Sequence, residues 1–422
     1  MGYDIWKGLA VIDWSEDVAG AFCARLLADM GARVIKIELP AGDKVRKMGP
    51  FPDDLPNQEK SGLFLALNSN KLGMTLNPFC ETGRSFFMQM VKDADVLVVD
   101  RSPAELEERG FNYESLREVN PRLVMTSITP FGSVGPYRDY LATDLTIFHM
   151  CAYARGMLRM HLIDPDPDAR VPVRAQWQQV GLIGGLAGST ATSLALLQRD
   201  STGEGASVEV SLWEAMCMMN SGGYNTASYG QQELVDPRPT NKLRGSVSTK
   251  GRVLPTNDGY ATVLPRVARH WESWIDLVGA PEWAKEERFV RGVRTEEDLQ
   301  ELQQKERELV QVMEEWTRQR SKNEVFNLAV AVGIPVFPVN TVADLFHSPH
   351  LAVHLAERGF FRTIEHPVAG SLPYPGTPFK IEGMAPTVDR PAPVLGEHTE
   401  ELLGELGISR QKLVKLRALG VI

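Results

Sequence analysis

Short apolar runs alternate with amphipathic segments in the first part of the chain. The runs with the length and β-branched composition of buried strands are residues 9–15, 33–39, 94–100 and 122–131. The segment between the first two runs carries apolar residues at helical spacing from Phe22 to Met30, and Gly31 ends it. Strands that alternate with helices predict an α/β domain with a mostly parallel, doubly wound, Rossmann-like sheet.

The junction between the first strand and the first helix reads SEDVAG, from Ser15 to Gly20. It lacks the GxGxxG pattern, whose glycines let the backbone approach a pyrophosphate. The sequence therefore disfavours a nicotinamide or flavin enzyme.

A long helix predicted after Val173 carries glycines at intervals of three and four residues: Gly181, Gly184, Gly185 and Gly188. No carboxylate, thiol or imidazole lies between Val173 and Leu197. Glycine inside a helix costs about 1 kcal/mol relative to alanine, so a compensating interaction is expected. Close backbone packing is the favoured explanation, and a ligand that approaches the helix is the alternative.

The remaining pattern predicts a chain that leaves its first domain and returns to it. A polar segment rich in Gly and Pro separates the glycine helix from a short strand pattern and a highly charged helix over 296–320, interpreted as a solvated face. The predicted division is 1–215 for the first part of a large domain, 216–245 for a linker, 246–325 for a small central α+β domain, and 326–422 for the return and tail.

Composition narrows the class of partner. The net charge is -9 and the pI is about 5.5, which argues against nucleic acid or an anionic membrane as the main partner. No segment is expected to reach the roughly 18 apolar residues that a membrane span needs, and the cytoplasm is the expected location.

Metal and nucleophile motifs are weak. His350 and His354 have the spacing of a zinc-binding helix, but Leu351 stands where a Glu would follow and no third ligand is evident, so no metal site is expected. There is no GxSxG motif. The cysteines lie far apart without a CxxC pair and are interpreted as core thiols: Cys23, Cys80, Cys151 and Cys217.

Several segments together resemble one family, CoA-transferase family III, also called CaiB/BaiF. In order along the chain they are AGAFCARLLADMGARVIKIE, LNSNKLGMTLN, ADVLVVD, NPRLVMTSITPFGSVGPYRD, STGEGASVEVSLWEA, NDGY, HPVAGSLPYPGTPF and LGEHTEELL. The resemblance implies a large α/β domain built from both chain ends, a small central domain and two subunits threaded through each other as interlocked rings. It also implies an Asp that attacks an acyl-CoA thioester, with CoA esters as substrates and no covalently bound cofactor.

The position of that nucleophile is occupied by Gly181. The count forward from Val173 of VPVRAQ and the count backward from Thr202 of TGEG reach the same residue. The racemase branch of the family is rejected as well, because its Gly-His-Asp segment reads Ala142-Thr143-Asp144 here and its Asp shares position 181.

The CoA-binding pattern implied by the resemblance is degenerate. Residues that still match it are Val18, Ala19, Asn70 and Lys71, and residues that depart from it are Leu39, Leu72, Asp100 and Arg101. Lys71 and the turn Gly132–Gly135 are the remaining candidates for a phosphate contact.

The hypothesis is a non-catalytic subunit of a heteromeric member, interlocked with a paralogous chain that carries the Asp. Such a complex would move CoA from a donor such as succinyl-CoA to an acid such as benzylsuccinate, and residues 244–250 would form a wall of the partner's site. One alternative is an active homodimer that uses a displaced carboxylate, Asp144 or Glu214. The other is a non-catalytic protein that binds acyl-CoA.

Overall fold

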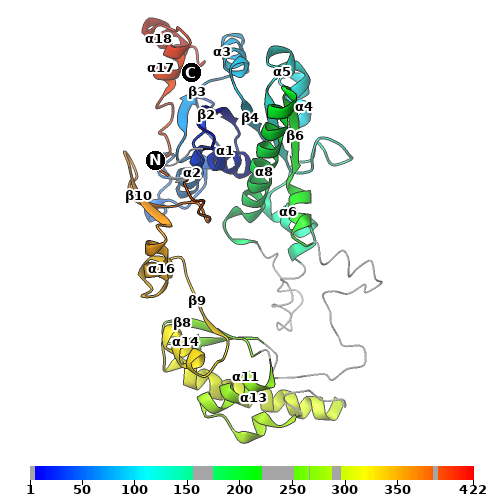
Figure 1. Ribbon diagram of the computed structural model, residues 1–422, viewed down its shortest axis with the longest axis vertical. Coiled ribbons are helices and arrows are strands. Elements are labelled where there is room, and N and C mark those ends of the chain that lie inside the picture. Colours follow the sequence, from blue (N-terminus) through cyan, green and yellow to red (C-terminus); the bar gives the residue numbers. More distant parts are fainter. Residues whose placement is uncertain (1–4, 155–173, 221–250, 266, 288–295, 384–387) are drawn as a thin grey trace. The chain divides into compact units, whose positions relative to one another are not determined.

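The structure is a computed structural model that describes residues 5–154, 174–220, 251–265, 267–287, 296–383 and 388–422. The chain forms two compact units, which Figure 1 shows with their elements. The large unit comprises Met1–Val235 with Gly359–Ile422, and the small unit comprises Asp236–Arg358.

The large unit is built on a six-stranded sheet in the order β3-β2-β1-β4-β5-β6. All neighbouring strands are parallel, and Ile12 of the central strand lies opposite Ile35 on one side and Leu97 on the other. The strands are β1 (Ala10–Trp14), β2 (Arg33–Glu38), β3 (Leu72–Thr75), β4 (Val96–Val99), β5 (Val124–Thr129) and β6 (Ala206–Ser211). The predicted doubly wound α/β sheet is therefore confirmed.

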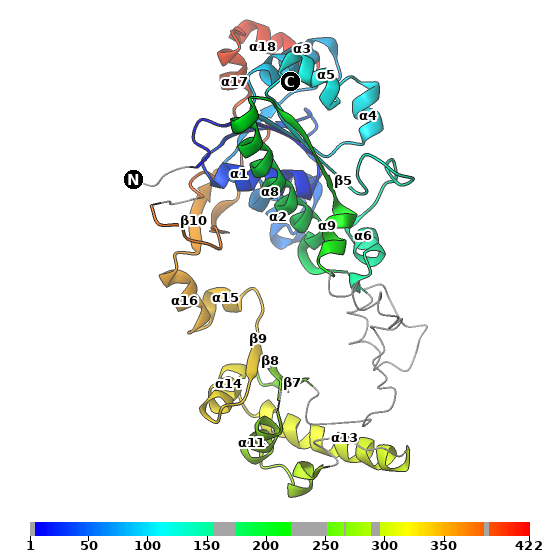
Figure 2. The same ribbon diagram turned by 45° about the vertical axis from the view of Figure 1, so that its right-hand side comes forward.

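Helices cover both faces of this sheet, as Figure 2 shows. Alternate strand residues separate two cores: Val11 faces α1 (Val18–Asp29) and α8 (Gln179–Thr202), while Ile12 faces the other set. That set is α3 (Glu81–Lys92), α4 (Pro103–Glu108), α5 (Tyr113–Val119), α17 (Thr399–Glu405) and α18 (Arg410–Ala418). The other helices that the structure describes in this unit are α2 (Gly62–Leu67), α6 (Asp144–Met150), α9 (Leu212–Met218) and the short 3₁₀ turns Val45–Lys47, Pro52–Asp54 and Gln176–Gln178.

The C-terminal segment completes the large unit along strand β3. It enters through the antiparallel hairpin β10 (Phe361–His366) and β11 (Gly370–Pro375). The backbone N–H of Thr75 then donates to Thr399 Oγ1 at 3.0 Å, and that of Asn77 donates to the Val421 carbonyl at 2.8 Å. Both chain ends therefore form one domain, as expected.

The small unit extends further along the chain than the predicted boundary at residue 325. Its antiparallel sheet pairs β7 (Arg252–Thr256) with β8 (Gly259–Val263), and β8 with β9 (Val336–Val339). The assignment of residues 326–358 to the large domain is therefore wrong, because the apolar run after Ile334 supplies this third strand. Helix α9 also continues through Met218 into the expected linker, of which residues 221–245 lie outside the described part of the chain.

Helices pack on one face of this small sheet. They are α11 (Ala268–Val278), α13 (Glu296–Arg318) and α14 (Lys322–Ala331), with the turn Glu282–Lys285. The short helices α15 (Asp344–His347) and α16 (Leu351–Glu357) also belong to the unit but contribute no residue to this core. The charged helix α13 is not solvated all round, because Leu302, Leu309 and Met313 lie in the core of the unit. Its spacing of seven and four residues places them on one stripe.

Helix α8 corrects the expectation about membrane spans. With the turn before it, the segment Gln176–Thr202 is long and apolar enough to cross a membrane by length and composition alone. In this fold α8 lies against α1 and the sheet, and its buried Arg199 donates to Asp95 Oδ1 at 2.8 Å. Core helices of this kind satisfy the same criterion, so it is weak evidence for a span.

A network of buried charges lies under the end of β1. Lys71 is fully buried, and its ammonium donates to Asp13 Oδ2, the Ala21 carbonyl and Asn68 Oδ1, each at 2.8 Å. Lys36, also buried, lies 2.6 Å from Asp43 Oδ2. Burial lowers the pKa of Lys71 to about 8, although Asp13 acts in the opposite direction. The network fixes the start of the loop that leads into α1.

We expect Lys71→Met to lower the free energy of unfolding by about 3–5 kcal/mol, because it removes the cation that pairs with Asp13 Oδ2 and leaves that oxygen and two other buried acceptors without the Lys71 donor. Arg33→Met is the matched control. It removes a cation whose pair with Glu405 is about half exposed, so a loss of at most about 1 kcal/mol is expected. Urea unfolding of both variants measures this, and equal losses would contradict the role given to the network.

Candidate functional site

The large unit has a cavity of about 250 Å³ at the carboxyl edge of its sheet. It lies where residues after β1, β4 and β5 meet the first turns of α1 and α8. The strand order reverses between β1 and β4, and open α/β sheets bind ligands in the crevice at such a point. This cavity is therefore the candidate site.

Gly181 lies in the wall of the cavity, in the first turn of α8. Trp177 and Gln178, just before the helix, have positive φ angles of 59° and 56° and turn the chain into it. A Cβ atom at Gly181 would lie 2.8 Å from both Cβ and Cγ1 of Val18, which is closer than such atoms approach. Val18 of α1 thus occupies the space that a side chain at position 181 would need.

The other glycines of α8 continue the same close contact. A Cβ atom at Gly185 would lie 2.6 Å from the Ala19 carbonyl oxygen, and one at Gly188 would lie 2.7 Å from Ile128 Cδ1. The glycine face therefore packs backbone against α1 and the sheet, which supports the packing explanation. The gain in packing offsets the cost of glycine in the helix.

Asp144 brings a carboxylate to the same place. It begins α6 and lines the cavity, and its Oδ1 accepts from the backbone N–H of Val180 at 3.1 Å. Its Oδ2 is buried without a hydrogen-bond partner among the described residues. Burial raises the pKa of this carboxyl group, although the amides of Val180 and Gly181 lower it.

The other carboxylate proposed from the sequence, Glu214, is not at the site. It lies exposed in the first turn of α9, outside the lining of the cavity, where its backbone N–H donates to Ser211 Oγ at 3.2 Å. Of the two displaced carboxylates, the geometry favours Asp144.

Asp100 follows β4 and reaches across to the loop after β1. Its carboxylate accepts the backbone N–H of Glu16 at 2.9 Å and that of Asp17 at 2.6 Å. The next amide, that of Val18, donates to the Asp17 carboxylate at 2.7 Å. Burial, together with the charge of Asp17, raises the pKa of Asp100 to about 7 despite the hydrogen bond from Glu16.

Arg101 and Leu39 lie outside the lining of the cavity. Arg101 points to the other side of the loop, where it forms an ion pair with Glu16 and stacks 4.7 Å from the centre of the Trp14 ring. Leu39 follows β2 and is half-buried.

Lys71 does not fit the role of a phosphate contact. All three of its donors are used inside the protein, and its side chain has no solvent exposure. A buried ammonium of this kind holds the fold rather than a ligand.

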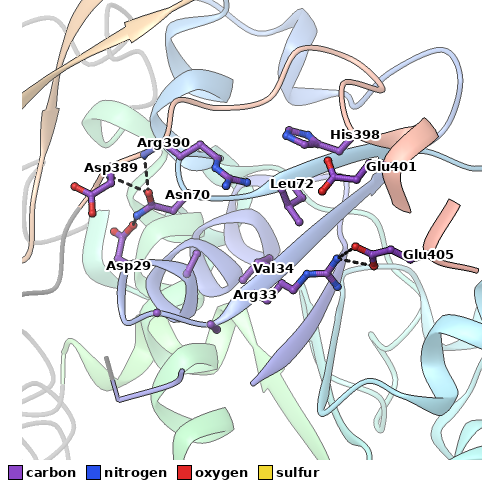
Figure 3. Close-up of a pocket in the computed structure, with 13 residues that line it drawn as sticks. Asp29, Arg33, Val34, Asn70, Leu72, Asp389, Arg390, His398, Glu401 and Glu405 are labelled. Carbon is purple, nitrogen blue, oxygen red and sulfur yellow. Dashed lines mark hydrogen bonds and ion pairs between the residues drawn. The ribbon is translucent and has the colours of Figure 1, made fainter. Parts of the chain in front are cut away.

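Asn70 and Leu72 lie at the opposite edge of the sheet, beside a second cavity of about 540 Å³ shown in Figure 3. There the Asn70 side chain donates to Asp29 Oδ1 at 2.8 Å and accepts from the backbone N–H of Asp389 and Arg390. Because this edge holds the amino ends of β2 and β3, neither residue can take part in a site at the carboxyl edge. Of the four residues that match the CoA pattern, only Val18 and Ala19 line the candidate site.

The glycine turn after β5 is also engaged internally. The backbone N–H of Ser133 donates to Glu209 Oε1 at 2.8 Å, and the Ser133 hydroxyl bonds the same carboxylate. A Cβ atom at Gly132 would lie 2.6 Å from that oxygen, so glycine is needed for the approach.

The charged residues that line the candidate site are mostly acidic. The four carboxylates are Asp17, Asp100, Asp139 and Asp144, and the two cations are Lys44 and Arg138. Both cations are paired, Lys44 with Glu16 at 3.2 Å and Arg138 with Glu107 at 3.0 Å. The site therefore offers little attraction to a polyanion.

The histidines and cysteines singled out in the sequence were not expected to form a metal site or a nucleophile, and the structure shows where they lie. His350 and His354 are both exposed, and the described residues contain no group of three His, Cys, Asp or Glu side chains placed to hold a metal. Cys23 and Cys151 are buried, Cys80 and Cys217 partly so, and all four are free. Burial raises the pKa of Cys23 to about 12, which suits a core thiol rather than a nucleophile. Residues 244–250 lie outside the described residues.

Sequence reasoning missed the lining residues Lys44, Arg138, Tyr140 and Leu141. Three of them belong to the segment that follows β5. The rule that ligands bind beyond the carboxyl ends of parallel strands would have drawn attention to that segment. No linear signal showed that Asp100 binds the amides after β1.

Comparisons with known proteins agree across nearly the whole chain. CoA-transferase family III matches residues 6–399. The succinyl-CoA:(R)-benzylsuccinate CoA-transferase subunit BbsE of Thauera aromatica is 31% identical over 100% of this chain and 99% of its own. The formyl-CoA:oxalate CoA-transferase of Streptomyces avermitilis is 30% identical over 99% of each.

A solved structure has the same fold. A CaiB/BaiF family protein from Brucella suis superposes with a TM-score of 0.77 at 27% identity, covering 95% of this chain and 99% of its own. Together with the family match over most of the sequence, this agreement places the chain in a single family. The chain belongs to CoA-transferase family III.

Proposed function

We propose that this chain is the non-catalytic subunit of a heteromeric CoA-transferase. The observation that carries the proposal is the contact between Gly181 and Val18. The family's chemistry needs a carboxylate that becomes covalently acylated, and position 181 has neither a carboxylate nor room for one. The chain then contributes scaffold while a paralogous partner, with Asp at the matching position, forms the acyl intermediate.

The proposed complex consists of interlocked subunits in the cytoplasm and takes CoA esters as substrates. Similarity to a benzylsuccinate CoA-transferase subunit along the full length supports succinyl-CoA as donor and benzylsuccinate as acceptor. In the partner, the Asp carboxylate attacks the thioester carbonyl and releases CoA thiolate. The thiolate then attacks the aspartyl carbonyl of the anhydride and releases the donor acid, and the acceptor acid completes the exchange by the reverse sequence.

A second candidate is an active enzyme that uses Asp144. Its carboxylate reaches the first turn of α8, and one of its oxygens has no partner among the described residues. Burial raises its pKa, however, and the oxygen without a partner is buried. An attack on a thioester would require this oxygen to become exposed, so we favour the scaffold role.

Co-expression tests the first proposal. We expect no transfer of CoA from succinyl-CoA to benzylsuccinate by this chain alone, and activity when it is purified as a complex with the paralogue that carries Asp. Initial rates and native mass spectrometry measure both quantities. Full activity of this chain alone would overturn the scaffold assignment.

We expect Gly181→Asp to remain inactive alone and to lower the free energy of unfolding by about 1–3 kcal/mol, because the new Cβ overlaps Val18. Gly181→Ala, which adds the Cβ without a carboxylate, is the matched control. Its Cβ meets Val18 in the same way, so it should also lower the free energy of unfolding. The loss should be smaller by roughly 1 kcal/mol, because alanine is favoured over glycine in a helix by about that amount.

Val18→Ala added to Gly181→Asp should recover part of the loss by removing the two methyl groups. Urea midpoints report stability, and hydroxylamine trapping with peptide mass analysis reports acylation. An acyl-enzyme in the single variant would contradict this account of the closed position.

The same trapping experiment distinguishes the second candidate. If Asp144 were the nucleophile, succinyl-CoA and hydroxylamine would leave a hydroxamate on Asp144 in the wild-type chain. Asp144→Asn would abolish it, and Glu214→Gln, which removes an exposed carboxylate outside the cavity, would not. We expect no hydroxamate on this chain in any of the three proteins.

A further inference from the structure

The crevice between β1 and β4 is where a doubly wound sheet presents backbone amides to a phosphate. In such folds the phosphate lies at the N-terminus of the helix that follows β1, because unpaired N–H groups and the helix dipole favour negative charge there. The corresponding amides of this chain belong to Glu16, Asp17 and Val18.

Each of these three amides already has a carboxylate acceptor. Asp100 accepts from Glu16 and Asp17 at distances between 2.6 and 2.9 Å, and the Asp17 side chain accepts from Val18. Asp100 thus stands where the phosphate of a ligand would bind.

Among the described residues that line the crevice, neither cation is left to compensate for the lost amides. Lys44 and Arg138 are held by Glu16 and Glu107, and the amide of Ser133 in the turn after β5 is taken by a carboxylate too. A phosphate that entered the crevice would meet the Asp100 carboxylate at short range without a free cation among the lining residues.

We propose that Asp100 is a built-in anion that fills the phosphate position of this crevice and excludes the diphosphate of CoA from it. The inference rests on the proposed function in one respect: in the heteromeric complex, CoA would be bound by the partner alone. Asp100 is then a specificity-determining residue that keeps this chain out of competition for the shared substrate.

Isothermal titration of the full-length chain with inorganic pyrophosphate, and separately with CoA, tests the proposal at pH 8. Asp100→Ala opens the amides and removes the charge, and we expect it to bind both probes at least tenfold more tightly than wild type. Asp100→Asn removes the charge but keeps one acceptor oxygen, so a smaller gain is expected. Because Asn preserves part of the hydrogen bonding, it remains informative if the alanine variant does not fold.

Asp139→Asn is the matched control. It removes one carboxylate from the same lining while Arg138 stays paired with Glu107, and Asp139 holds none of the three amides. Its affinity for pyrophosphate should stay within threefold of wild type. A gain equal to that of Asp100→Ala would attribute the effect to general charge and overturn the proposal.

Tight pyrophosphate binding by the wild-type chain, or no gain in either Asp100 variant, would also overturn it. These outcomes are separate from the proposed function, which the transferase assay of the chain alone decides. A chain that is inactive alone and gains no affinity on substitution of Asp100 would retain the scaffold role and lose only this inference.

Discussion

The approach of α1 to α8 is the constraint on which the large unit depends. Gly185 allows the two backbones to come so close that a methyl group would collide with the Ala19 carbonyl, and Gly188 does the same toward Ile128. Because the helices lie so close, Cys23 is buried, and it belongs to the hydrophobic core between α1, α8 and the sheet. It also brings Val18 against Gly181, so the packing that stabilises the unit leaves no space for a side chain at position 181.

The polar groups around the sheet divide into those that hold the fold and those that border the crevice. Lys71, Lys36 and Asp13 form a buried network in which each ammonium has a carboxylate, and such groups are retained only when they are paired. The hydrogen bonds to the Asp100 carboxylate come instead from the backbone amides of Glu16 and Asp17. Two aspartates near the ends of neighbouring strands therefore have different roles: Asp13 pairs with buried lysines inside the fold, and Asp100 binds backbone amides at the crevice.

Much of the fold could be predicted from the sequence, because the periodicity of apolar residues reflects which face of a strand or helix is buried. The parallel sheet and the return of the C-terminal tail followed from such patterns, as did the close packing of the glycine helix. The predicted small domain ended too early in the chain. Apolar periodicity does not show which strands pair, and β9 pairs with β8, which lies more than 70 residues earlier in the sequence. Site residues were harder: Lys71 and Asn70 are adjacent in sequence, but one points into the interior and the other toward the far edge of the sheet.

The hydrogen bonds between the C-terminal segment and the region of β3 have a consequence for the order in which the large unit folds. Val421 and Ile422 lie in the core beside β3, so this side of the large unit is covered only after residues 399–422 have been synthesised. At about 5–20 residues per second, the ribosome needs roughly 10–40 s to make residues 236–422. During that interval the edge of β3 is uncovered, and its unpaired backbone groups are open to pairing with another strand.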